Sequence, residues 1–409
     1  MNSDNNNSNT PRLRFPGFTG EWEEKKLGDL ANKQNKRNRN LEVSRVLTNS
    51  ANAGVVEQSE YFDRDIAVKD NTANYHIVEL EDFVYNPRIS TAAPVGPISI
   101  NKVGRGIMSP LYTIFRFHTG SIPFYEQYFQ TTNWHPYLKS IANFGARFDR
   151  MNITSEGFFD MPLLLPTPAE QEKIASCLKA MDELIALQGQ KVKALKERKR
   201  GLMQQLFPQP GETTPRLRFP GFTGDWQEKK LGDLCVFVNK KCDVNDLNIS
   251  TYISTENMLQ DFEGVKVASK LPSKGSFTHF QKNDILFSNI RPYLRKVWQS
   301  VFEGAASNDV IVFRSKESNN CFFLTQILKS DSFIAHTMNG AKGVKMPRGD
   351  KKTMMEYILA VPPTVTEQSK IAECLSEMES LIAAEAAKFE ALKAYKRGLM
   401  QQLFPQPSK

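Results

Sequence analysis

The sequence KRGLMQQLFPQP at residues 199–210 recurs without a change at residues 396–407. A second stretch, TPRLRFPGFTGEWEEKKLGDL at residues 10–30, returns at residues 214–234 with only two differences. Two variable blocks, residues 31–169 and 235–366, lie between the repeated stretches. A period near 200 residues is far longer than the roughly 20–50 residues of a solenoid unit. The repeat therefore predicts two equivalent halves that do related but different jobs.

Each half ends in a segment that is predicted to form one long helix. Residues 167–170 have the pattern of a capping box, residues 364–367 repeat it, and a proline ends each segment. Apolar residues at alternating steps of four and three predict a coiled-coil seam. The seam residues are Ile174, Leu178, Met181, Ile185, Gln188, Val192 and Leu195 in the first helix, and Ile371, Leu375, Met378, Ile382, Glu385, Phe389 and Leu392 in the second. Antiparallel pairing would bury both seams; the alternative is that each helix packs on its own domain.

Polar residues interrupt both seams at equivalent positions. Gln188 and Glu385 lie near the middle of the two helices. We expect them to face each other and to fix the register of the pair, as single polar residues do in other coiled coils. Replacing both by leucine without any change of register or stability would refute this expectation.

Composition narrows the classes of function. The 409 residues contain 53 Lys and Arg and 45 Asp and Glu, and the net charge of +8 favours an anionic partner without deciding it. Five scattered cysteines without a C-x-x-C pair, and five histidines without an H-E-x-x-H motif, predict no disulfide framework, no metal site and a reducing cytosol. The sequence has no apolar stretch near the roughly 20 residues of a membrane helix and no phosphate-binding P-loop. Residues 1–10 are predicted to be a disordered leader.

The variable blocks alternate apolar segments with turn residues, which is typical of α+β domains rich in strand. Residues 82–88 match residues 284–291, each a predicted strand that runs into an Asn-x-Arg turn, and each block has a basic loop before its last strand. Arg and Asn can pair with base edges, and Lys can bind phosphates. We therefore expect DNA to be bound by Asn86, Arg88, Arg147, Arg150 and Asn152 in the first block, and by Asn289, Arg291, Arg295, Lys342, Lys345, Arg348 and Lys351 in the second. For any one of them, surface solubility or turn capping is the alternative.

With these features the chain resembles the specificity subunit of type I restriction–modification enzymes over roughly residues 11–407. The most specific features are the helix starts, the two Leu-Gly-Asp-Leu sequences and the sequence DILFSNIR at residues 284–291. The resemblance implies an α+β fold in which two pseudo-symmetric target-recognition domains are separated by two long helices paired as an antiparallel coiled coil. It implies recognition domains at 11–166 and 215–363, spacer helices at 167–207 and 364–407, and a linker at 208–214.

The resemblance also implies a non-catalytic, cytoplasmic DNA-binding subunit in bacterial defence. Each domain would read one half of a bipartite target in double-stranded DNA, with the half-sites about one helical turn apart. Two methyltransferase subunits and two restriction/translocase subunits would be its partners. They would bind S-adenosylmethionine, ATP and Mg, so the chain itself would need no cofactor. From the residues alone, two alternatives stay open: a coiled-coil adaptor that never touches DNA, and an enzyme that uses scattered carboxylates.

Overall fold

The computed structural model describes residues 9–61, 69–143, 149–209 and 211–405. The chain splits into two compact units. Unit 1 consists of residues up to 188 together with those from 388 onward, and unit 2 consists of residues 189–387. Each unit therefore contains one variable block and helical segments from both halves of the sequence. Within the described ranges, no helix is long and apolar enough to cross a membrane.

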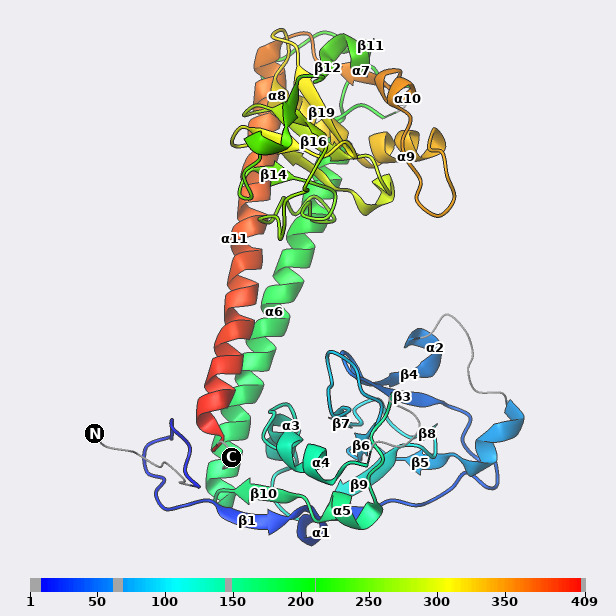
Figure 1. Ribbon diagram of the computed structural model, residues 1–409, viewed down its shortest axis with the longest axis vertical. Helices are drawn as coiled ribbons and strands as arrows, with labels where there is room; N and C mark the ends of the chain where they lie inside the picture. The colour runs from blue at the N-terminus through cyan, green and yellow to red at the C-terminus, as the bar shows by residue number, and fades with distance from the viewer. Residues whose placement is uncertain (1–8, 62–68, 144–148, 210, 406–409) are drawn as a thin grey trace. The chain divides into compact units, whose positions relative to one another are not determined.

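The variable block of unit 1 folds into short strands and helices around a four-stranded sheet of order β2-β9-β6-β7. Strands β1 and β10, β3 and β4, and β5 and β8 form antiparallel pairs beside it. Phe83 lies opposite Phe115 in the main sheet, and an aromatic core surrounds them. The elements are β1 (Glu23–Lys26), α1 (Leu27–Leu30), β2 (Ala31–Lys33), β3 (Leu47–Ser50), β4 (Gly54–Glu57), α2 (Gln58–Tyr61), η1 (Lys69–Asn74), β5 (His76–Val78), β6 (Phe83–Tyr85), β7 (Ile98–Ile100), β8 (Gly106–Met108), β9 (Thr113–Phe117), α3 (Ile122–Phe129), α4 (His135–Ile141), α5 (Ser155–Phe159) and β10 (Pro162–Leu165) (Figure 1).

Unit 2 has an equivalent four-stranded sheet of order β12-β19-β16-β17 and an equivalent pair of strands, β11 and β20. Unit 2 also has a second four-stranded sheet of order β13-β15-β18-β14, in which strands β14 and β18 are parallel, whereas the described residues of unit 1 form strand pairs beside their main sheet. The elements are β11 (Gln227–Lys230), α7 (Leu231–Leu234), β12 (Cys235–Phe237), β13 (Lys241–Asp243), η2 (Val244–Asp246), β14 (Tyr252–Ile253), β15 (Ser276–Phe280), β16 (Ile285–Ser288), η3 (Pro292–Leu294), β17 (Val297–Gln299), β18 (Gly304–Ala306), β19 (Val310–Ser315), α8 (Cys321–Leu328), α9 (Asp331–Asn339), α10 (Lys351–Met355) and β20 (Ile358–Val361).

An ion pair between a buried aspartate and a more exposed arginine shows that the two main sheets share a scaffold. Asp82 precedes β6 and binds Arg116 of β9, with 2.7 Å between the carboxylate and Nε. Asp284 precedes β16 and binds Arg314 of β19 at 2.6 and 2.7 Å. Both aspartates are buried. The correspondence predicted from the repeat therefore places the same charges at the same points of both sheets.

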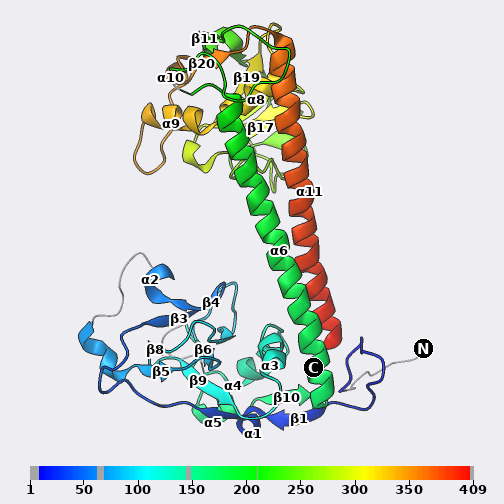
Figure 2. The same ribbon diagram turned by 180° about the vertical axis from the view of Figure 1, so that it is seen from behind.

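The two long helices, α6 (Pro168–Leu206) and α11 (Val365–Leu403), lie side by side within each unit (Figures 1 and 2). In unit 2, Lys191 binds Glu385 and Lys199 binds Glu379, so rising numbers on α6 meet falling numbers on α11. The helices are therefore antiparallel there. Every predicted seam residue is buried or half-buried. The ion pair of Glu385 with Lys191 was not predicted. The expected pairing of Glu385 with Gln188 stays a prediction.

The helix starts differ from the predicted capping boxes. The Glu170 carboxylate, only 1% exposed, accepts hydrogen bonds from Nε and Nη2 of Arg14 at 2.8 and 2.7 Å instead of reaching back to its own helix start. Glu367 binds Arg218 in the same way, at 2.8 and 2.9 Å. The carboxylate half of the prediction is wrong because a bidentate pair with a guanidinium is stronger than a bond to a neutral N–H. The threonine half holds at Thr364, whose hydroxyl accepts the Glu367 N–H.

The repeated stretches bind each other across the two halves of the sequence. In unit 1, the Leu13 N–H donates to the Gln402 carbonyl, and the Trp22 ring contacts Phe404 at 6.1 Å between centroids. In unit 2, the Leu217 N–H donates to the Gln205 carbonyl. The start of each half therefore docks on the end of the other half's helix, which explains why both stretches are repeated almost unchanged.

Candidate nucleic-acid interface

In unit 2, a strained turn follows strand β16. Arg291 and Arg295 have φ of 52° and 57°, in the left-handed region, and they flank the short helix η3. Non-glycine residues in this region cost about 1–3 kcal/mol each and persist where the surroundings hold them. The Arg291 side chain is exposed and has no hydrogen-bond or ion-pair partner in the part of the chain that is described. The turn therefore presents a guanidinium to solvent on a fixed backbone.

The basic loop of residues 342–348 is attached to this turn. Backbone N–H groups of Lys342 and Arg348 each donate to the carbonyl of the other at 2.9 Å, which closes the loop. The Arg291 N–H donates to the Pro347 carbonyl at 2.8 Å, and Ile290 forms a β-bridge with Arg348. The structure thus brings the predicted turn and the predicted basic loop into one surface.

The charges on this surface are mostly accessible. Lys345 is exposed, and the Lys342 side chain is 85% exposed and lies 3.8 Å from Asp350. A hydrogen bond from the Thr353 N–H holds the pKa of Asp350 below its ordinary value, so this carboxylate stays charged. Arg348 pairs with Asp309 at 3.1 Å. Pairs as exposed as these contribute little stability and can exchange partners at low cost.

Two predicted base contacts of unit 2, Arg295 and Asn289, are enclosed by the structure around the turn. Arg295 forms an ion pair with Asp331, and its guanidinium lies 5.1 Å from the centroid of the Phe262 ring. The Asn289 amide oxygen is buried, without a partner among the described residues, and a Cβ on Gly349 would lie 3.0 Å from it. In this conformation the Arg295 guanidinium joins the turn to α9 and to Phe262, and the Asn289 amide oxygen is buried, so neither group is presented to a ligand.

Unit 1 repeats the arrangement with different residues. Arg88 follows strand β6 and forms a β-bridge with Arg150, the Met151 N–H donates to the Pro87 carbonyl at 2.9 Å, and the Ile89 N–H donates to that of Asp149 at 3.0 Å. Arg88 is exposed, whereas Arg150 is half-buried with its Nε 3.6 Å from Asp149. The turn and the loop that precedes the last strand therefore meet in unit 1 as well.

The three remaining predicted residues of unit 1 are Asn86, Asn152 and Arg147, and each has a different environment. Asn86 is 8% exposed; its amide nitrogen donates to the Asn49 carbonyl at 2.9 Å and its oxygen accepts the Arg88 N–H at 3.1 Å. It shapes the turn and is not free to read a base in this conformation. Asn152 is exposed and forms a β-bridge with Asn143. The predicted contact Arg147 lies outside the described residues.

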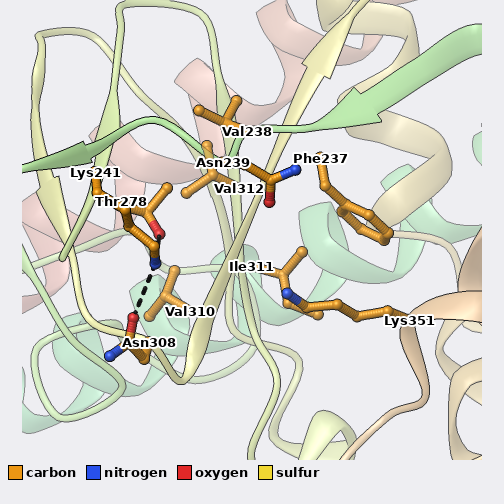
Figure 3. A pocket seen from close by; sticks show the side chains of 10 residues that line it. All are labelled: Phe237, Val238, Asn239, Lys241, Thr278, Asn308, Val310, Ile311, Val312 and Lys351. Atoms are coloured by element: carbon orange, nitrogen blue, oxygen red, sulfur yellow. Dashed lines mark hydrogen bonds between the residues drawn. The ribbon is translucent and has the colours of Figure 1, made fainter. Parts of the chain in front are cut away.

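Sequence reasoning missed a polar pocket beside the basic loop of unit 2 (Figure 3). Its volume is about 210 Å³, and Lys241 and Lys351 reach into it from opposite sides of the view. The Lys241 ammonium donates to Asn308 Oδ1 at 3.1 Å and to Thr278 Oγ1 at 3.2 Å. Lys351 lies over the Phe237 ring at 5.5 Å, so this predicted contact belongs to the pocket. The adjacent lysines at 240 and 241 were the available signal. No group of His, Cys, Asp or Glu suited to a metal ion occurs among the described residues.

Comparison with known proteins gives the same division into halves. A family model described as the type I restriction modification DNA specificity domain matches the chain twice, at residues 19–197 and 223–394. The type I restriction enzyme MjaVIII specificity subunit of Methanocaldococcus jannaschii is 25% identical over 187 residues, which are 44% of this chain and 42% of that protein. The chain thus aligns with about two fifths of this relative's length.

Two solved structures share the fold at low sequence identity. The first is a chain of a solved structure that concerns complex assembly and conformational transition of the type I R-M system. It aligns with a TM-score of 0.56 and 15% identity, covering 97% of this chain and 100% of that one. The type I restriction-modification S subunit from M. genitalium aligns with a TM-score of 0.56 and 12% identity, covering 97% and 99%. Both likenesses therefore extend over the two recognition blocks and both long helices.

Proposed function

The chain belongs to the family of type I restriction–modification DNA specificity domains, and on that premise we propose that it is the DNA-recognition subunit of a type I restriction–modification complex. Each unit reads one half of a bipartite target in double-stranded DNA. The observation that carries the proposal is a turn joined to a basic loop, built twice, by the β-bridge of Arg88 with Arg150 in unit 1 and that of Ile290 with Arg348 in unit 2. Two surfaces with one backbone plan and different side chains suit two half-sites of different sequence.

The chemistry of the unit 2 surface fits this role. A guanidinium can bind guanine O6 and N7 together, which is a common specific contact in the major groove. Arg291 is free to do so on a backbone that its neighbours hold. The exposed ammonium groups of Lys342 and Lys345 suit phosphates, which position a protein on DNA without reading sequence. The comparisons give no support to an adaptor that never touches DNA.

In this proposal the chain is non-catalytic, lies in the cytoplasm, and directs two methyltransferase and two restriction/translocase subunits to the target. Those partners supply S-adenosylmethionine, ATP and Mg. The family description, which names restriction and modification together with DNA specificity, supports this division of labour. Helices α6 and α11 each contribute to both units, which supports a role as spacer between the half-sites. Inserting four residues after Leu187 should then change the preferred gap in the methylated target.

The decisive experiment maps methylated bases in the genome of cells that carry the chain and its partner subunits. Wild type should give one bipartite motif. Arg88→Ala should relax or abolish one half of it, and Arg291→Ala the other half. Glu373→Gln, on the exposed face of α11, serves as the control and should leave the motif intact. The proposal would be contradicted if both arginine variants lost the same half of the motif, or if wild type methylated one continuous motif instead of a bipartite one.

A further inference from the structure

The basic loop of unit 2 has an apolar tip. Val344 is 103% exposed and Met346 is 49% exposed, and neither belongs to a core cluster. Lys345 separates them, and Lys342 and Arg348 flank them. Single exposed apolar residues are ordinary, but two at the tip of one loop among three cations contribute nothing to packing and reduce solubility. Their exposure calls for a ligand.

The tip stands on a rigid base. Pro347 and Gly349 are buried, and a Cβ on Gly349 would lie 2.3 Å from Met354 Cε and 2.7 Å from Thr337 Cγ2. Two backbone hydrogen bonds close the loop, and a third joins it to the Arg291 turn. The segment between α9 and α10, drawn in orange, projects from the sheets of unit 2 (Figures 1 and 2). The base of the loop is therefore fixed, and its tip is directed away from the core of unit 2.

We propose that Val344 and Met346 make apolar contact with the bases of the half-site that unit 2 reads, while the neighbouring cations bind the phosphates. The inference rests on the proposed function and extends it to the residues that determine specificity. Apolar side chains contact the thymine methyl group in the major groove or enter between base steps as wedges. Both are the same chemistry, apolar surface against a base.

The charges favour DNA over a protein as the occupant. Stable protein interfaces bury about 800 Å² on each partner and are depleted of lysine at their centre. Here two apolar side chains lie among Lys342, Lys345 and Arg348, all exposed. A duplex offers bases in the groove and phosphates along both of its edges, which matches this alternation of apolar and cationic groups.

The test uses the full chain, a duplex carrying the wild-type methylated motif, and a duplex of random sequence. Val344→Asn with Met346→Gln keeps side chains of similar size at the tip and replaces their apolar groups by amides. We expect about tenfold weaker binding to the motif, with unchanged binding to random DNA and an unchanged salt dependence. The matched control, Lys345→Gln, should weaken binding to both duplexes and lower the salt slope by about one unit.

The outcomes separate the inference from the function on which it rests. Unchanged affinity of the double variant for the motif, or equal losses on both duplexes, would overturn the apolar contact and leave the proposed function standing. Equal affinity of wild type for both duplexes would overturn both. A motif duplex with deoxyuridine in place of thymidine tells the two modes apart. If the double variant then binds as tightly as wild type, the apolar contact is to the thymine methyl group. If the difference in affinity persists, the side chains act as a wedge between base steps. Equal melting temperatures of variant and wild type confirm folding.

Discussion

Replacing Glu170 by Gln should destabilise unit 1 strongly, although the change removes a single charge. The carboxylate is 1% exposed and receives two hydrogen bonds from Arg14, whose side chain is 17% exposed. Removing one partner of such a pair leaves the other charge buried and unpaired, which costs about 3–5 kcal/mol of stability. Glutamine retains one acceptor oxygen for Arg14, so we expect a loss of about 2–3 kcal/mol in the free energy of unfolding.

Differential scanning calorimetry measures this loss directly. For a unit of this size, each 1 kcal/mol lowers the melting temperature by about 2–4 °C, so the transition that involves unit 1 should shift down by about 4–12 °C. Glu367→Gln removes the equivalent charge beside Arg218 and should shift the transition of unit 2 by a similar amount. The exposed pair of Lys370 and Glu373 on α11 provides the control, because Glu373→Gln should leave the melting temperature unchanged.

A shift below about 2 °C in Glu170→Gln would refute the reasoning, since it would mean that the pair contributes no more than a surface ion pair. A large shift in Glu170→Gln with none in Glu367→Gln would refute the equivalence of the two docking contacts.

Three further outcomes follow from the structure. Arg291→Ala should weaken binding to the unit 2 half-site by about 1–3 kcal/mol in a titration with motif DNA; equal losses on random DNA would make it a phosphate contact. Gly96→Ala should destabilise unit 1 by about 1–3 kcal/mol in thermal melting, because φ is +79° and a Cβ would lie 2.1 Å from the Asn86 carbonyl oxygen. Burial acts to raise the pKa of Glu379, but two neighbouring lysines outweigh it and leave that pKa below its ordinary value. Stability from this ionised group is therefore present above the ordinary carboxylate pKa and lost as pH falls through the lowered one, so Glu379→Gln should flatten the fall in unfolding free energy between neutral pH and about pH 3.

The repeat and the seam spacing were sufficient to predict the long antiparallel helices and the common scaffold of the two blocks. Both depend on local periodicity or on identity between distant stretches, which a sequence displays directly. The buried aspartates Asp82 and Asp284, which pair with Arg116 and Arg314, occupy positions that the match of residues 82–88 with 284–291 had already aligned.

The site was less predictable because residue type does not specify the partner of a side chain. Arg295 has the chemistry of a base contact, but its guanidinium pairs with Asp331 and lies over the Phe262 ring. Both residues are distant from Arg295 in the sequence. Asn86 likewise bonds to the Asn49 carbonyl from a distant strand. The same limit applies to Glu170, whose local pattern predicted a cap while a guanidinium from the start of the chain was the stronger partner.

The docking of each half's first residues on the other half's helix end bears on how such a protein can diversify. Because near-identical stretches border both variable blocks, a genetic crossover within them exchanges a whole reading block while the buried arginine–glutamate clasp and the aromatic contacts stay intact. An exchanged block would then keep the contacts that its borders make, and its own residues would have to supply the remaining contacts to the helices, such as those of Gln127 with Asp182 and Asn133 with the Pro405 carbonyl.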